Sequence, residues 1–119
     1  MKYLLLIYEK EGVWAALPDA ERARLHQGYI DYTKRIRKDG NYIAGEALQP
    51  VSTATTVRVK DGKTLTTDGP FAETREQLGG FYLVEAKDLD QALKLAAGIP
   101  SVQTGSIEVR PIQPFDFPD

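Results

Sequence analysis

The sequence predicts a single α+β domain in which two helices cover one face of an antiparallel sheet. Two segments with helical periodicity are each flanked by β-type segments, which gives two β-α-β units. A hairpin separates these units, so the β-α-β arrangement is a split one. The chain has 119 residues, of which 42% are apolar and 27% charged. This size and composition fit one globular domain with a core of its own.

The first β-α-β unit begins with an almost continuous apolar run at residues 2–8, which is typical of a strand covered on both faces. Residues 9–14 are expected to form a loop. A helix then begins with Pro18 in its first turn and ends at Gly40, which suits a left-handed cap. Residues 42–48 form the second strand. The apolar stripe of the helix is expected at Leu25, Tyr29, Tyr32 and Ile36.

The middle of the chain predicts a β-hairpin around Asp61 and Gly62. A two-residue loop would pair Leu65 with Arg58, and a three-residue loop would pair Leu65 with Val57. We prefer the three-residue loop because it places the apolar side chains of the hairpin on one face.

The second β-α-β unit begins with a strand at residues 78–86. The pair Gly79-Gly80 within it indicates a bulge or a close backbone approach. Asp88 is expected to cap the following helix, and residues 105–112 form the last strand. The buried face of that helix is expected at Leu89, Ala92, Leu93 and Ala96.

The order of these elements resembles a ferredoxin-like fold. We expect the domain to span residues 1–112 and the proline-rich residues 113–119 to form an extended arm.

The open face of the predicted sheet requires a cover. Two helices can cover only one face, yet residues 4–6 and 81–84 are apolar on both. A second copy packed sheet to sheet is the simplest cover, which predicts a homodimer. The alternative is that the loop at residues 9–14 and the C-terminal arm cover this face.

The composition argues against several classes of protein. A net charge of −2 argues against a general nucleic-acid binder. The absence of cysteine excludes disulfides and thiolate sites, and one histidine makes a histidine-based metal site unexpected. No segment is long enough to span a membrane, and the apolar start lacks the form of a secretory signal. We therefore expect a cytoplasmic protein without metal or cofactor.

The stretch T-D-G-P-F-A-E-T-R-E-Q-L-G-G-F at residues 67–81 resembles the hallmark of the DGPF branch of the YCII-related proteins. Residues 2–8, 44–50 and 54–58 support the resemblance, which covers residues 2 to about 112. It implies a dimeric α/β-barrel fold, shared with muconolactone isomerase-like enzymes and small cofactor-free monooxygenases.

The resemblance implies two functional expectations. Some members are encoded beside, or fused to, sigma factors of the extracytoplasmic type, which makes such a factor a candidate partner. In the wider group a histidine and an aspartate are proposed as an acid/base pair. Asp68 matches that aspartate only loosely, and His26, on the first helix, has no match to that histidine.

Three residues are candidates for proton transfer. Asp68, at a strand end before a Gly-Pro pair, can act as a general base or can cap its own turn. Glu46 lies in an apolar strand on the face of Ala44 and Leu48, where it either points into the barrel or faces solvent. His26 adjoins the apolar stripe of the first helix and is either a half-buried surface residue or a catalytic one.

Five further residues are candidates for ligand contact. Arg75 can clamp an anionic ligand or form local salt bridges in a solvated loop. The aromatic residues can line an apolar pocket, or can belong to the core or the dimer interface: Tyr8, Phe71, Phe81 and Tyr82.

Two functions of different classes remain open from the sequence. The first is a cofactor-free enzyme or small-molecule binder, with isomerase- or monooxygenase-like chemistry suggested by the superfamily alone. The second is a non-catalytic regulatory or scaffold dimer that binds a protein through the motif loop or the C-terminal arm.

Overall fold

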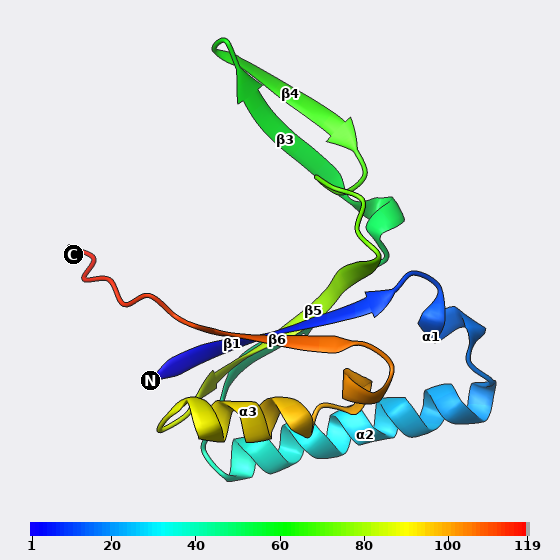
Figure 1. Cartoon of the computed structure of the whole chain (residues 1–119), viewed down its shortest axis with the longest axis vertical. Helices are drawn as coiled ribbons and strands as arrows, with labels where there is room; N and C mark the ends of the chain where they lie inside the picture. Colours follow the sequence, from blue (N-terminus) through cyan, green and yellow to red (C-terminus); the bar gives the residue numbers. More distant parts are fainter. Residues whose placement is uncertain (119) are drawn as a thin grey trace.

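The protein is a four-stranded antiparallel sheet with two helices on one face (Figure 1). The computed structural model describes residues 1–118. The sheet order is β2-β5-β1-β6. Its elements are β1 (Lys2–Lys10), α2 (Asp19–Lys38), β2 (Tyr42–Ala47), β5 (Glu76–Glu85), α3 (Leu89–Ala97) and β6 (Ser106–Pro111). This is a ferredoxin-like split β-α-β fold, which confirms the predicted fold class.

Strict alternation along β1 creates the two faces of the sheet. Tyr3, Leu5 and Ile7 point toward the helices and are buried, whereas Leu4 and Leu6 point to the opposite face and are half-buried. Strand β5 behaves in the same way. One core therefore lies between the sheet and the helices, and the apolar opposite face has no helix over it.

Helix α2 contributes the largest buried side chains of the helical layer, Tyr32 and Ile36. Its C-terminal end carries three basic residues, which suit the negative end of the helix dipole. Gly40 follows with φ at 82°, so the predicted left-handed cap is present. The Tyr32 hydroxyl donates a 2.7 Å hydrogen bond to the Leu95 carbonyl and thereby links α2 to α3.

Helix α3 is capped as predicted, because the Asp88 carboxylate accepts a 2.9 Å hydrogen bond from the Gln91 N–H. The expected buried face is only half right. Ala92 and Ala96 are buried, but Leu89 and Leu93 are exposed. The small alanine side chains bring the helix close to the sheet, and this turns the two leucines outward.

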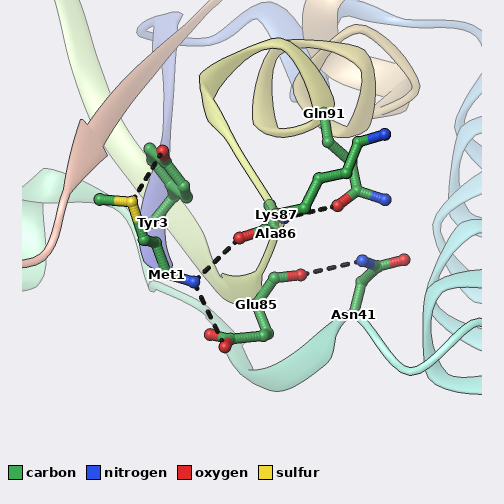
Figure 2. A network of polar contacts seen from close by, with 7 residues as sticks. All are labelled: Met1, Tyr3, Asn41, Glu85, Ala86, Lys87 and Gln91. Atoms are coloured by element: carbon green, nitrogen blue, oxygen red, sulfur yellow. Dashed lines mark hydrogen bonds and ion pairs between the residues drawn. The ribbon is translucent and has the colours of Figure 1, made fainter.

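One corner of the sheet is held by a polar network (Figure 2). The amino group of Met1 bonds the Glu85 carboxylate at 3.3 Å and the Ala86 carbonyl at 3.0 Å. The Asn41 amide donates to the Glu85 carbonyl at 2.8 Å, and the Gln91 side chain accepts from the Lys87 N–H at 2.8 Å. The network joins the start of β1, the end of β5, and the residues that precede β2 and α3.

The glycine pair in β5 produces the predicted irregularity. Ile7 of β1 pairs with Gly80, and Tyr8 pairs with Leu78, so Gly79 is the extra residue of a bulge. A Cβ atom on Gly80 would lie 2.9 Å from the Glu46 carbonyl oxygen. The strand thus needs glycine at this position for close approach to β2.

Strands β3 (Thr55–Lys60) and β4 (Lys63–Asp68) form a separate two-stranded hairpin that projects from the body (Figure 1). Our preferred register was wrong, because Arg58 pairs with Leu65 across a two-residue loop. Asp61 and Gly62 both have positive φ, at 52° and 76°, as a type I′ turn requires. Both faces of the hairpin are solvent-exposed, so burial does not select a register and the turn residues decide it.

The connections contain three short helical segments: α1 (Val13–Ala16), η1 (Val51–Thr53) and η2 (Pro100–Gln103). The expected loop at residues 9–14 is therefore wrong in part, since β1 continues to Lys10 and α1 begins at Val13. No helix among the described residues is long and apolar enough to cross a membrane.

Candidate functional site

A cavity of about 720 Å³ lies between α2 and one end of the sheet. Its walls come from α2, from the C-terminal ends of β1 and β2, and from the first half of β5. It extends along the sheet as far as Tyr42, the residue after Asn41 of the corner in Figure 2. A volume of this size is typical of sites for small molecules.

Helix α2 presents one row of polar and aromatic side chains to the cavity: His26, Tyr29, Thr33 and Arg37. Successive members are three, four and four residues apart, so they lie above one another on one face of the helix. This row runs beside the buried stripe of Tyr32 and Ile36. The helix thus contributes one stripe of side chains to the core and an adjacent row of side chains to the cavity wall.

The sheet wall combines a carboxylate, an aromatic ring and two glycines. Glu9 and Tyr82 line the cavity from β1 and β5, and Gly45 and Gly80 line it from β2 and β5. A Cβ atom on Gly45 would lie 2.8 Å from the Tyr82 ring. The absence of side chains at these glycines lets the Tyr82 ring lie against Gly45 and lets β2 and β5 approach each other at Gly80.

Two pairs of hydroxyl groups stand in the cavity wall. The Thr33 hydroxyl lies 2.7 Å from the Tyr82 hydroxyl and donates to the Tyr29 carbonyl at 2.8 Å. Because the single hydrogen of Thr33 is used there, Tyr82 is the donor within the first pair. In the second pair, the hydroxyls of Tyr29 and Ser101 are hydrogen-bonded to each other. That bond uses one of two hydrogens, so the second pair retains one donor for a ligand.

Burial controls the protonation of these tyrosines. Desolvation raises the pKa of Tyr29, and the nearby Glu9 carboxylate raises it further, although the Ser101 hydroxyl lowers it. Desolvation also raises the pKa of Tyr82, although its hydrogen bond with the Thr33 hydroxyl lowers it. Both phenols are therefore neutral hydrogen-bonding groups at physiological pH.

Four of the eight candidate residues line this cavity: His26, Glu46, Phe81 and Tyr82. Strand alternation directs the Tyr82 side chain to the helix face, but it directs the side chains of Phe81 and its β2 partner Glu46 to the open face of the sheet. Only Tyr82 is buried. His26 is exposed at the mouth, and Glu46 is exposed on β2 opposite Phe81. Of the two alternatives for Glu46, the exposed one holds in the single chain.

The other candidates lie elsewhere. Tyr8 does not line the cavity, and Asp68, Phe71 and Arg75 are exposed at the base of the hairpin and in the motif loop. The Asp68 carboxylate makes no hydrogen bond within residues 1–118. The turn is held instead by Gly69, whose N–H bonds the Ala54 carbonyl at 2.8 Å. In the single chain, Asp68 therefore neither reaches the cavity nor caps its turn with its side chain.

Sequence reasoning misses Glu9, because the apolar run that predicts the first strand ends at Tyr8 and residues 9–14 are expected to form a loop. The alternation of Leu5, Ile7 and Glu9 continues along β1 and places all three on the helix face. That spacing was a usable signal. Ser101 had no comparable signal, since its place depends on how η2 packs against α2.

The charged groups of the cavity do not form a metal centre. No group of three histidine, aspartate or glutamate side chains that could hold a metal ion is present among residues 1–118. The arrangement instead offers an imidazole, a carboxylate, a guanidinium and hydroxyl groups around an open space. Such groups can bind a polar ligand and move protons on it.

The comparison with known proteins agrees with this architecture. A protein of Rhizobium meliloti, itself uncharacterised, is 38% identical over 114 residues, which cover 94% of this chain and 92% of that protein. The solved structure of the 5-chloro-2-hydroxyhydroquinone dehydrochlorinase of Burkholderia phenoliruptrix, in complex with 2,5-dihydroxybenzoquinone, is similar in fold. Its TM-score is 0.56 at 13% identity, over 95% of this chain and 94% of that one. The family model of the YCII-related domain matches residues 1–116, and the chain belongs to the YCII-related family.

Proposed function

We propose that this protein is a cofactor-free small-molecule-binding protein or enzyme whose site is the cavity between α2 and the sheet. The observation that carries this proposal is that His26, Glu9 and the Tyr29–Ser101 pair line one open space of about 720 Å³. Tyr29 and Ser101 place hydroxyl groups at half-buried and buried positions of this lining, where apolar side chains would cost less if the space bound nothing.

The proposed chemistry is proton transfer on a small ring compound. His26 is the proposed acid/base residue because an imidazole can both accept and donate a proton, and the Glu9 carboxylate is a second candidate base. The free hydrogen of the Tyr29–Ser101 pair would stabilise negative charge that develops on a ligand oxygen. Glu46 pairs with Phe81 and shares the open face of the sheet with it, so Glu46 and Asp68 are acid/base candidates that would both need a contact from outside the single chain to take part.

The similar fold supports a ring-shaped ligand by analogy. The dehydrochlorinase was solved with a quinone, which is planar and carries oxygen atoms at its edge. The cavity described above has ring faces and hydroxyl groups that suit such a molecule. The proposal includes isomerase- and monooxygenase-like reactions, which the resemblance to the dimeric α/β-barrel superfamily suggests.

A ligand screen with a cavity-filling variant tests this function. Ala47 lines the cavity from an exposed position on β2, so Ala47→Trp fills the space without disturbing the core. Ala97→Trp, at the exposed end of α3, is the matched control. A metabolite at ~100 times its Kd adds ~2.7 kcal/mol to the folded state and raises the melting temperature. Compounds that stabilise the wild type and the control but not Ala47→Trp support the proposal; a library without such compounds contradicts it.

We also propose a homodimer formed through the open face of the sheet. Leu4, Leu6, Phe81 and Leu83 form an apolar strip on this face and are half-buried in the single chain. Phe115 and Phe117 of the C-terminal arm are 73% and 80% exposed, and the arm runs away from the sheet in Figure 1. Intramolecular cover by the arm, which was the alternative, therefore has no support from the single chain.

A second candidate function is that of a regulatory dimer that binds a protein, for which a sigma factor is one candidate. The specific observation is the exposed hairpin, with Val57 at 62%, Val59 at 70% and the neighbouring motif residue Phe71 at 78% exposure. An isolated hairpin is marginally stable unless it packs on something. Replacing residues 56–67 by a short Gly-Ser linker should abolish capture of a sigma factor while the body remains folded. Capture that survives the replacement would contradict a role for the hairpin.

A further inference from the structure

The geometry points to an anion subsite at the Arg37 end of the cavity, and we infer that the ligand is a planar ring compound that carries a carboxylate. This inference rests on the proposed function, because it assumes that the cavity binds a small molecule. It adds the charge and shape of that molecule, and it assigns the role of binding the carboxylate to Arg37.

Arg37 has a free positive charge in the cavity wall. Its guanidinium carbon lies 4.6 Å from the centre of the Tyr42 ring, and both residues line the cavity. No carboxylate lies within 4.0 Å of it among residues 1–118, where the ion pairs are Met1–Glu85, Arg22–Asp19 and Arg24–Glu21. The planar fork of arginine matches a carboxylate in a two-point contact, and no protein carboxylate occupies that position.

Arg35, two residues earlier on α2, is an arginine with a structural role and serves as a comparison for Arg37. Its guanidinium lies 5.3 Å from the centre of the Tyr32 ring. One of its terminal nitrogens lies 3.0 Å from the position that a Cβ atom on Gly98 would take. Arg35 therefore packs between two helices and does not line the cavity. Both arginines cover a tyrosine, but only Arg37 presents its charge to an open space.

The rest of the cavity fixes the direction in which an anion would bind. Lys10 is the other cation of the lining, but Glu9 and Glu11 flank it and also line the cavity. That end therefore carries net negative charge, and the Arg37 end carries net positive charge. An anionic ligand would place its carboxylate at Arg37 and its ring toward the centre of the cavity.

The aromatic wall beside Arg37 suits a ring. The Tyr42 and Tyr82 rings lie 6.4 Å apart in an edge-to-face arrangement, and the absence of a side chain on Gly45 lets the Tyr82 ring lie directly against β2. Side chains of a helix lean toward its N-terminus, so the fork of Arg37 reaches toward Thr33. Tyr29 is eight positions before Arg37, which is about 12 Å along the helix axis. Because the fork reaches back along the helix, a ring whose carboxylate binds Arg37 would extend toward the Tyr29–Ser101 pair.

Benzoate and benzamide are suitable probes, because they share a shape and differ in charge. Their affinities are to be measured by calorimetry for the wild type, for Arg37→Gln and for the matched control Arg35→Gln. The inference predicts that the wild type binds benzoate about tenfold or more tightly than benzamide. Arg37→Gln should lose this preference, whereas Arg35→Gln should keep it.

The outcomes separate this inference from the proposed function. Equal affinity for the two probes in the wild type, or a benzoate preference that survives in Arg37→Gln, overturns the anion subsite. If both probes still bind and Ala47→Trp abolishes that binding, the cavity nevertheless remains the small-molecule site. Fragments of this size are expected to bind with a Kd of about 10 mM or lower. If neither probe binds at about 10 mM, both the anion subsite and the proposed small-molecule site are overturned.

Discussion

The hydroxyl oxygens of Thr33 and Tyr82 lie 2.7 Å apart and join helix α2 to the central strand β5. The Thr33 hydrogen is donated to the Tyr29 carbonyl, so the Tyr82 phenol donates to Thr33. This bond stands in the wall of the cavity and holds the Tyr82 ring against Gly45. It therefore contributes to stability and also sets the shape of the proposed site.

Removing the Tyr82 hydroxyl should destabilise the fold. Tyr82→Phe keeps the buried ring but deletes the bond to Thr33, which should lower the free energy of unfolding by about 1 kcal/mol. Tyr42→Phe is the matched control, because the Tyr42 hydroxyl has no hydrogen-bond partner among residues 1–118, and its effect should stay within about 0.5 kcal/mol. Urea denaturation measures both. Equal stability of the two variants would show that the Thr33–Tyr82 bond contributes nothing.

Alkaline pH should destabilise the protein through its buried tyrosines. Desolvation raises the pKa of Tyr29, Tyr32 and Tyr82 above the unfolded value. The folded state then binds more protons than the unfolded chain, so stability is fully present below about pH 10 and falls as the pH rises above it. Ultraviolet titration should show that three of the six tyrosines ionise only at a higher pH in the folded protein than in the unfolded chain. Ionisation of all six together in the folded protein would contradict this.

The two neighbouring glycines of β5 should respond differently to alanine. A Cβ atom on Gly80 meets the Glu46 carbonyl oxygen at 2.9 Å, whereas one on Gly79 meets the Ile7 carbonyl oxygen only at 3.9 Å. Gly80→Ala should cost about 1–3 kcal/mol of unfolding free energy, because backbone must move, and Gly79→Ala should cost less than about 1 kcal/mol. Thermal or urea unfolding distinguishes them. A larger loss in Gly79→Ala would mean that the bulge is placed differently.

The open face of the sheet should mediate dimerisation. Leu6 pairs laterally with Phe81 on β5 in the centre of the apolar strip, so Leu6→Glu introduces a charge where two copies would meet. Sedimentation should give twice the chain mass for the wild type and a single chain mass for the variant. Leu93→Glu, on the exposed side of α3, is the control and should remain dimeric. A wild type that sediments as one chain at micromolar concentration rules the dimer out.

The sheet and the helical layer can be predicted from sequence patterns, because each pattern reflects which side chains are buried. The alternation in β1 and the stripe on α2 predict the sheet, its helices and the apolar open face, since each pattern matches one side of a core. The hairpin register did not follow from the same logic. Val57 and Leu65 are both exposed, and the backbone of Asp61-Gly62 decides their pairing.

The site could be predicted only in fragments. Tyr82 and His26 carry side chains that suggest chemistry, but their meeting in one cavity depends on how α2 lies across the sheet. Ser101 approaches Tyr29 from 72 residues away in the sequence. The sequence motif makes Asp68 a candidate, but Asp68 lies at the end of β4 in the exposed hairpin and does not line the cavity.

The central claim is that the cavity binds a small molecule, and amide NMR shifts on addition of benzoate test it most directly. The claim predicts that shifts concentrate on α2 between residues 26 and 37, on residues 45–51 and on residues 77–82, which line the cavity. Helix α3 and the hairpin should remain unchanged. Shifts confined to the hairpin and the motif loop, or none at saturating concentration, would contradict the claim and favour the regulatory dimer.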